Sequence, residues 1–291
     1  MPHPLLIHLH LPKNAGTTFS RMLKLRLLLS PPWRVFRHQV TLGYYFVPGL
    51  DPRVQRINDL PEAKRKKVRF FEAHCGWGIH ERLPGPSAYL TVIREPIDRT
   101  LSVYFFRKQQ GKLPQETRLE DWISASPDQT VWHVDNGQVR YLAGEHGRIL
   151  DVPIGEVTRE HLETAKARLS EMFFVGIMER FDESIVLFRR AMGWKKASYG
   201  RSNVTKKRKK KDEIDTAQRE LIARHNVLDT ELYAFACELF QQRITAAGPG
   251  FAEEVVRFKA KNAAHNRRLG WLYELLPAIR SKLQKLRLIG R

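Results

Sequence analysis

The stretch HLHLPKNAGTTFSRML, residues 8–23, determines how the rest of the chain is interpreted. An apolar run ends in PKNAGTT, residues 12–18, and apolar residues at helical spacing follow at once. Backbone N–H groups at a helix N-terminus bind phosphate, because they lack partners within the helix and lie at the positive end of its dipole. Residues 12–18 therefore predict a phosphate-binding loop between a strand and a helix.

The spacing within this loop differs from that of an ATP-binding loop. An ATP-type loop reads GxxxxGK[ST], with its lysine after the last glycine. Here Lys13 precedes Gly16, and Thr17 and Thr18 close the turn. We expect the shorter loop to hold one phosphate with the amides near Gly16 to Thr18, while Lys13 reaches the same group from the strand side.

Strands and helices alternate along the first two thirds of the chain. Buried strands are expected at residues 4–11, 34–40, 68–74, 88–93 and 173–177. Helices are expected at residues 17–29, 96–106, 119–124, 131–142, 160–171 and 181–192. This alternation is typical of a parallel sheet covered by helices on both faces, which is a three-layer α/β/α fold.

Polar side chains follow the expected ends of several strands. Lys13, His74, Arg94 and Glu179 all lie at or just after such an end. Because ligands of open parallel sheets bind at the carboxyl ends of the strands, these four residues predict a single site.

The chain changes character after Met192. Residues 193–214 are rich in Gly, Ser and Lys, and helices are expected at 216–224 and 229–243. We expect one domain over residues 1–247 and a basic, amphipathic helical extension over 248–291. The extension is typical either of peripheral contact with an anionic membrane or of packing on the protein's own core.

Net charge, cysteine content and hydropathy limit the classes of partner and the cellular compartment that we expect. The 291 residues carry a formal net charge of +19, and the isoelectric point near 10.1 favours a polyanionic partner such as an acidic glycan. Only two cysteines are present, which is typical of a reducing compartment rather than a disulfide framework. No stretch approaches the ~20 apolar residues of a membrane span, and no basic start leads into a signal-peptide core. We therefore expect a cytoplasmic location.

Two phosphate-binding elements carry a resemblance to a known family. HLHLPKNAGTTF resembles the 5′-phosphosulfate loop of sulfotransferases that use 3′-phosphoadenosine 5′-phosphosulfate (PAPS), most closely their heparan sulfate 2-O-sulfotransferase-like branch, where the loop commonly reads PKTAGT. Asn14 replaces threonine there. TVIREPIDRTLSVY supplies the family's second element, an arginine with a serine eight positions on, as Arg94 and Ser102. FEAHCGWG, FFVGIMERFDESIVLF and LDTELYAFACELF are similar to later family segments, so the resemblance covers residues 5–243.

This resemblance implies a P-loop-NTPase-like sulfotransferase fold and a role for each matching residue. Lys13 would stabilise the departing phosphate during sulfuryl transfer from PAPS. The residues holding the 5′-phosphate would be Lys13, Asn14, Ala15, Gly16, Thr17 and Thr18. Arg94 and Ser102 would hold the 3′-phosphate, while Asn203 and Thr205, in NVTKKR, would close over the nucleotide. The product would be 3′-phosphoadenosine 5′-phosphate (PAP), and no metal is required.

The acceptor hydroxyl needs a general base, and two residues are candidates. Imidazole titrates in the useful range, and His74 follows a strand that also carries Glu72, two residues earlier on the same face. The related branch has two histidines in this arrangement, and other carbohydrate sulfotransferases use a glutamate. We favour His74 as the base with Glu72 orienting or assisting it, and leave the reverse open. His8 and His10 are expected to be scaffold residues of the first strand.

Two further residues are candidates for contact with the acceptor. Asn136 and Arg140, in DNGQVRYL, lie four apart on an expected helix and would share one face. The alternative is a solvated helix face with no role in binding.

Three functions compete at this level. The first is a PAPS-dependent sulfotransferase acting on a carbohydrate hydroxyl, with an acidic acceptor favoured by the charge. The second is a P-loop-like nucleotide kinase, which lacks here its lysine after the glycine and its Mg²⁺-binding hydroxyl. The third, a basic nucleic-acid-binding protein, explains the charge of +19 but leaves the paired phosphate elements unexplained.

Overall fold

The computed structural model describes residues 5–29, 57, 60–66, 68, 70–124, 131–200 and 214–285. Its strands are β1 (Leu5–Leu9), β2 (Phe70–Ala73), β3 (Ser87–Ile93) and β4 (Phe174–Ile177). Its α-helices are α1 (Gly16–Leu29), α3 (Glu62–Arg65), α4 (Pro96–Gln109), α5 (Leu119–Ser124), α6 (Val131–Val134), α7 (Gly137–Ala143), α8 (Arg159–Glu171), α9 (Phe181–Ala191), α10 (Thr216–His225), α11 (Val227–Ala246) and α12 (Phe251–Lys285). Short 3-10 helices span Ile79–Arg82 and Met178–Arg180.

The four strands form one parallel sheet in the order β2-β1-β3-β4. β1 is buried along its whole length and lies between β2 and β3, as the apolar run LLIHL predicts. The chain passes from β1 to β2 on one side and then crosses back to β3 on the other. The loop after β1 therefore stands at the point where the strand order reverses, which is where parallel sheets bind ligands.

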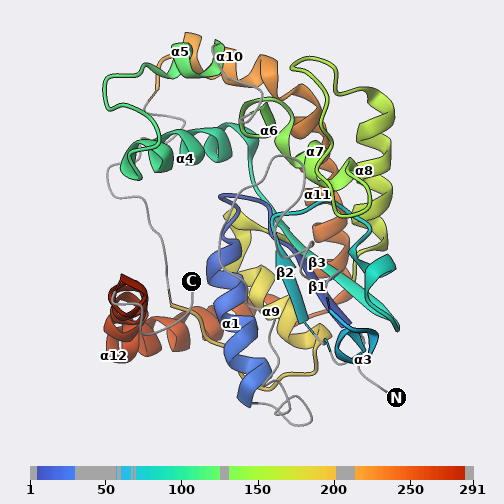
Figure 1. The fold of residues 1–291 in the computed structure, drawn as a ribbon. Coiled ribbons are helices and arrows are strands. Elements are labelled where there is room, and N and C mark those ends of the chain that lie inside the picture. Colours follow the sequence, from blue (N-terminus) through green and yellow to red (C-terminus); the bar gives the residue numbers. More distant parts are fainter. Residues whose placement is uncertain are drawn as a thin grey trace.

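Helices cover both faces of the sheet, which confirms the predicted α/β/α class (Figure 1). α1 and α9 cover one face, where Phe19 of α1 lies 5.7 Å from Phe174 of β4 and 5.1 Å from Phe188 of α9 between ring centroids. α7, α8 and α11 cover the other face. The core is continuous through the three layers.

A second, smaller core lies beyond the carboxyl ends of the strands. Leu101 of α4, Trp122 of α5 and Ile222 of α10 belong to it, and these helices stand above the sheet in Figure 1. α4 begins where Glu95 accepts a hydrogen bond from the Asp98 amide at 2.7 Å and Pro96 occupies the first turn. This arrangement fixes the start of α4 directly after β3.

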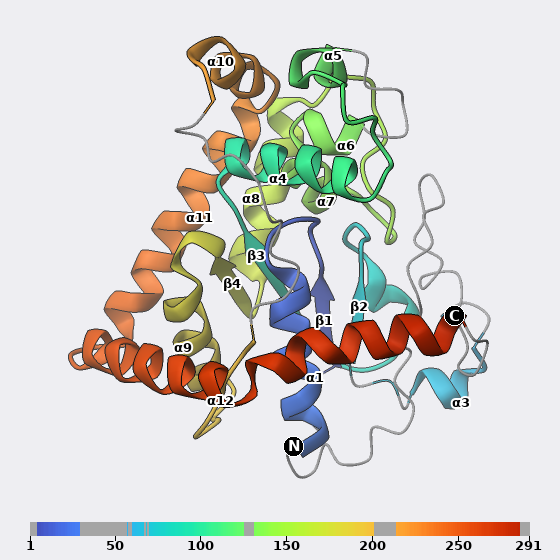
Figure 2. The same cartoon turned by 90° about the vertical axis from the view of Figure 1, so that its left-hand side faces the viewer.

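The first turns of α12 pack on the main domain, while the helix continues across it (Figure 2). Phe251, Val255 and Phe258 are buried in the same core as the sheet. Asn262 accepts a hydrogen bond from the Tyr199 amide at 2.9 Å. Packing on the core, one of the two alternatives for this segment, is thus observed for its first half. Within the described residues, no helix combines the length and the apolar character needed to cross a membrane.

Most expected elements are present within a few residues of their predicted bounds. The helix expected over residues 131–142 is instead two helices, α6 and α7, because Asn136 adopts a left-handed conformation with φ 44° between them. The strand expected at residues 34–40 lies outside the described residues.

Candidate active site

The loop between β1 and α1 is shaped by two residues with positive φ, Lys13 at 67° and Ala15 at 59°. Gly16 is the first residue of α1. A Cβ atom at Gly16 would lie 2.1 Å from Cδ2 of His10, so this glycine is required by the ring packed against it. The histidine ring and the loop therefore determine each other's position.

The first turn of α1 faces the loop with its amides. The N–H groups of Thr18 and Phe19 donate to the Ala15 carbonyl at 3.0 and 3.1 Å. The amides of Gly16 and Thr17 precede them at the start of the helix, where backbone N–H groups bind anions. The residues predicted to hold the 5′-phosphate are thus brought together in one turn.

The loop is fastened to the end of β3 by two side-chain amides. Asn14 Nδ2 donates to the Val92 carbonyl and to Gln138 Oε1, both at 2.8 Å. Gln138 Oε1 also accepts from the Arg94 amide at 3.0 Å, and its Nε2 donates to the Arg94 carbonyl at 2.8 Å. Gln138 is fully buried. It ties together the two segments that the sequence assigns to the two phosphates.

The side chain of Arg94 reaches the same loop. Its Nη1 donates to the Lys13 carbonyl at 2.8 Å, and the residue is 5% exposed. Ser102 is buried on α4, which begins two residues after Arg94. The ammonium of Lys13 lies 3.8 Å from the ring centroid of Phe106, also on α4. Two basic residues from adjacent strand ends thus share one corner.

One carboxylate, Glu179 at the end of β4, lies near this basic corner. Its Oε1 is 3.9 Å from Arg94 Nε and accepts from the Glu95 amide at 3.3 Å. Tyr233 donates to its Oε2 at 3.1 Å. Burial raises the pKa of the Glu179 carboxyl, while the Arg94 charge and the hydrogen bonds from Glu95 and Tyr233 oppose this shift.

On the opposite side of the loop, His74 lies just past the end of β2 and is partly exposed. Its Nδ1 is 2.5 Å from the His10 carbonyl oxygen. A carbonyl only accepts hydrogen bonds, so Nδ1 carries the proton, and the neutral ring has its lone pair at Nε2. This is the tautomer that a base acting through Nε2 requires.

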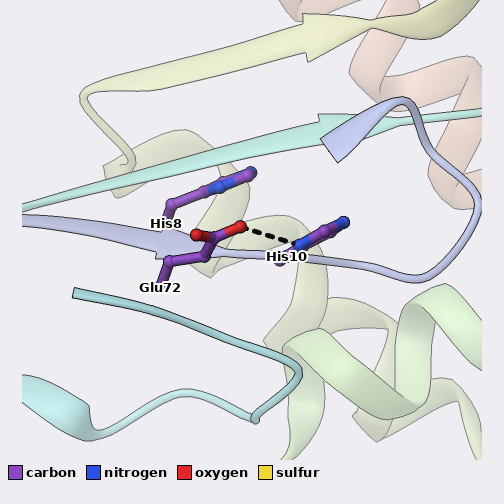
Figure 3. Close-up of side chains that lie close together, drawn as sticks. All are labelled: His8, His10 and Glu72. Atoms are coloured by element: carbon purple, nitrogen blue, oxygen red, sulfur yellow. Dashed lines mark hydrogen bonds and ion pairs between the residues drawn. The ribbon is translucent and has the colours of Figure 1, made fainter. Parts of the chain in front are cut away.

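Glu72, the other candidate base, is 8% exposed and held between two donors. Its Oε1 accepts from His10 Nδ1 at 3.0 Å (Figure 3), and its Oε2 lies 2.5 Å from Lys24 Nζ of α1. Burial alone would raise the pKa of this carboxyl, but the His10 hydrogen bond and the Lys24 charge hold it well below its usual range. A carboxylate that binds protons so weakly is a poor base, and the geometry favours His74.

In the part of the chain that the structure describes, one group of three side chains has the composition of a metal site: His8, His10 and Glu72, whose ligand-type atoms lie within 4.8 Å of one another. Hydrogen bonds already engage these groups, since His8 Nδ1 is 2.8 Å from Ser20 Oγ and Glu72 binds His10 and Lys24. A dication would have to displace the Lys24 ammonium. We therefore treat the three residues as a hydrogen-bonding network rather than as metal ligands.

The expectation that Asn136 and Arg140 face an acceptor is wrong, and neither lies on a solvated face. Arg140 is fully buried; its guanidinium donates to Asp135 and to the carbonyls of Val152 and Pro153 at 2.6 and 2.9 Å. Asn136 Oδ1 caps α11, accepting from the amides of residues 228 and 229 at 2.9 and 3.1 Å. Asn203 and Thr205 lie outside the described residues.

Sequence reasoning missed Gln138 and its support. Asp229 of α11 accepts from the Gln138 amide at 2.9 Å and from the Val139 amide at 2.8 Å, which caps α7. Asp229 and Asn136 thus cap each other's helix across more than 90 residues of chain. A glutamine in an amphipathic helix gives no signal of this role, because its partners lie on distant segments.

Comparison with known proteins agrees with this geometry. Residues 2–236 match the Sulfotransferase family. The chain is 25% identical over 267 residues to heparan sulfate 2-O-sulfotransferase 1 of Gallus gallus, covering 81% of this chain and 70% of that protein. It is 27% identical over 288 residues to heparan-sulfate 6-O-sulfotransferase 3 of Homo sapiens, covering 82% of this chain and 58% of that protein.

The fold and the loop between β1 and α1 are those of a P-loop-like α/β protein, with the loop at the switch point of a parallel sheet. The family match, which covers more than half of the chain, goes further: the protein belongs to the sulfotransferase family. Membership implies PAPS as the sulfuryl donor and PAP as the product.

Proposed function

We propose that this protein transfers the sulfuryl group of PAPS to a hydroxyl group of a carbohydrate, with an acidic glycan as the acceptor. The observation that carries the proposal is the contact between the two phosphate elements, in which Arg94 Nη1 donates to the Lys13 carbonyl and Gln138 joins Arg94 to Asn14. Residues that hold two phosphate groups of one molecule must lie this close together. The net charge of +19 and the names of the relatives support an acidic glycan.

The residues of the loop would bind the donor and stabilise the leaving group. The amides of Gly16 and Thr17, with the hydroxyls of Thr17 and Thr18, would hold the 5′-phosphate. Lys13 would move from the Phe106 ring to the bridging oxygen, where its charge stabilises the phosphate that departs. Arg94 and Ser102 would hold the 3′-phosphate, which distinguishes PAPS from ATP.

His74 would act as the general base. Its Nε2 accepts the proton of the acceptor hydroxyl while the hydroxyl oxygen forms a bond to sulfur. The bond between sulfur and the bridging oxygen breaks at the same time, and its electron pair leaves with PAP. The hydrogen bond from Nδ1 to the His10 carbonyl keeps Nε2 as the accepting atom.

The proposal is tested by transfer of labelled sulfate from PAPS to heparan-type and other acidic polysaccharides, with a neutral polysaccharide beside them. We expect transfer to an acidic acceptor in the presence of EDTA, because no step uses a metal. Lys13→Ala is expected to lower turnover by roughly 10²–10³-fold, the usual cost of removing one group that stabilises developing charge. Arg94→Ala is expected to weaken PAP binding.

The matched control is Ser184→Ala, which removes a buried hydroxyl that hydrogen-bonds Ile177 on α9's side of the sheet. It is expected to lower stability and leave donor binding unchanged. Wild-type PAP affinity in both Lys13→Ala and Arg94→Ala, or a requirement for Mg²⁺, would overturn the proposal.

A further inference from the structure

The corner beside His74 contains a chain of contacts that donor binding does not require. Lys24 of α1 contacts Glu72 of β2, which accepts from the ring of His10, at the end of β1. The carbonyl of His10 accepts from His74, and the two histidine rings lie 4.4 Å apart between centroids. Residues of α1, β2 and the end of β1 are thus connected to His74 through the Glu72 carboxylate and His10. Figure 3 shows the hydrogen bond between Glu72 and His10.

Glu72 is a buried carboxylate in a strand whose other residues are apolar. A carboxylate that is 8% exposed has lost most of its water, and His10 and Lys24 more than compensate for this loss, since they hold the pKa of the carboxyl well below its usual range. In the sheet register Glu72 is opposite His8, a position where an apolar side chain would pack against α1 without a charge to compensate. Glu72 is connected through His10 to the partly exposed His74, whose ring donates to the His10 carbonyl, and this connection points to a function at His74.

We propose that Lys24, Glu72 and His10 are positioning residues that orient His74 and set the proton affinity of its Nε2. The inference rests on the proposed function, which makes His74 the base. His10 is more than scaffold: its ring is fixed by Glu72 on one side and by Gly16 on the other, so the carbonyl that holds His74 is fixed too.

The electrostatic part of the proposal has a definite sign. The Glu72 anion favours the protonated form of His74, while the Lys24 cation opposes it. The titratable groups that the contacts connect to His74 are His10 just after β1, His8 of β1, Glu72 of β2 and Lys24 of α1, with the thiol of Cys75 next in the chain. Among them, Glu72 and Lys24 carry opposite charges whose removal has opposite effects.

A titration of His74 tests this sign without any measurement of sulfate transfer. Histidine labelled with ¹³C at Cε1 is followed by NMR as a function of pH, and the His74 signal is assigned from its loss in His74→Gln. Glu72→Gln is expected to lower the pKa of His74 and Lys24→Met to raise it, each by on the order of 0.5–1 unit. A role in packing alone would not give shifts of opposite sign.

Kinetics give the second measurement. In Glu72→Gln the acid limb of the kcat profile is expected to move to lower pH, and in Lys24→Met to higher pH. The KM for PAPS is expected to change less than twofold in both, because neither residue contacts the donor. Ser184→Ala again serves as the control for a lost buried hydrogen bond and is expected to leave both limbs in place.

Each other outcome overturns the inference in a recognisable way. Shifts of the same sign, or none, would show that the network only supports the fold. If Glu72→Gln is inactive while the separate variant His74→Ala retains its rate, Glu72 is the base. A shift in the His74 titration on addition of Zn²⁺ to the wild type, absent in His8→Asn, would make the cluster a metal site. Failure of the proposed function would be recognised by a different result, namely wild-type PAP affinity in Lys13→Ala and Arg94→Ala.

Discussion

On the side of β3 the phosphate loop is held by neutral amides together with the Arg94 guanidinium, and on the side of β2 it is held by charged side chains that titrate. Toward β3, Asn14 and Gln138 use only side-chain and backbone amide groups. Toward β2, His10 is held by Glu72, which is paired with Lys24. Amide contacts are insensitive to pH across the range in which proteins fold, whereas the other side changes with protonation. In the proposed function the first side would hold the donor in place, and the second is suited to handling a proton.

Among the variants that probe the two sides of the loop, Gly16→Ala is expected to have the largest effect on donor binding, because Gly16 lies where the two sides meet. The new Cβ would lie 2.1 Å from His10 Cδ2, so either the ring or the start of α1 must move. Donor affinity is expected to fall by at least about tenfold, which corresponds to roughly 1.4 kcal/mol, as measured by calorimetric titration with PAP.

A second substitution identifies the cause of this loss. In the double variant Gly16→Ala with His10→Ala, the ring that blocks the Cβ is gone, and PAP affinity is expected to recover to that of His10→Ala alone. Additive losses in the double variant would contradict the steric explanation.

Gln138→Leu removes the neutral amide contacts that this side chain makes between the loop and the end of β3. It leaves the buried amide and carbonyl of Arg94 without their side-chain partner, at a cost of about 1–3 kcal/mol for each group. We expect lower stability in thermal unfolding and weaker PAP binding, with the pH dependence of kcat unchanged. Gln218→Leu, which makes the same change on α10 where the side chain binds Glu120, is the control and should leave PAP binding intact.

The stability of the protein at acid pH tests the charged contacts of Glu72 on the side of β2. The pKa of Glu72 is lowered in the folded protein because His10 and Lys24 outweigh its burial. Its ion therefore contributes stability above the unfolded value of about 4.3, and the contribution is lost as pH falls through the lower folded value. Each unit of lowering corresponds to about 1.4 kcal/mol.

The measurement compares the free energy of unfolding of the wild type and Glu72→Gln between pH 7 and pH 3. The difference between the two is expected to shrink as the solution becomes more acidic. Glu163→Gln removes an exposed carboxylate that pairs with Lys166, and its small difference should stay nearly constant. A gap for Glu72→Gln that is equally constant would mean that the charge contributes nothing.

The smallest effect is expected from Phe106→Leu. The ammonium of Lys13 rests 3.8 Å from the Phe106 centroid, a contact worth about 0.5–1 kcal/mol at a partly exposed site. If Lys13 must leave the Phe106 ring to reach the donor, removal of the ring should tighten PAP binding by roughly two- to fivefold. Weaker binding in this variant would instead make the ring part of the donor site.

The parts of the structure that were predictable from sequence are those with local signals. Apolar runs alternating with helical patterns predicted the parallel sheet, and PKNAGTT lies where it was expected, between β1 and α1. The break at Asn136 was not predictable, because its left-handed backbone is stabilised by capping α11 more than 90 residues away. Arg140 was misjudged because charge usually indicates solvent, whereas here the guanidinium is buried and donates to five acceptor atoms.

The charged side of the loop was only half predictable. Glu72 and His74 were found because a strand places alternate residues on one face. Lys24 gave no signal, since a lysine in a helix normally faces water, and its role depends on the packing of α1 over β2. The reason for Gly16 was also hidden, because the atom it must avoid belongs to His10 rather than to its own backbone.

Because Asn136 caps α11 and Asp229 caps α7, the order of synthesis affects when the protein can finish folding. The four described strands and the segments around Lys13 and Arg94 are synthesised by residue 177, but the amides of Gln138 and Val139 have their carboxylate partner only after Asp229 has been synthesised. Contacts so distant in sequence form late and slowly. Nascent chains of increasing length are thus expected to acquire PAP binding only once Asp229 has left the ribosome, so translation of the last quarter of the chain sets the moment at which the enzyme becomes competent.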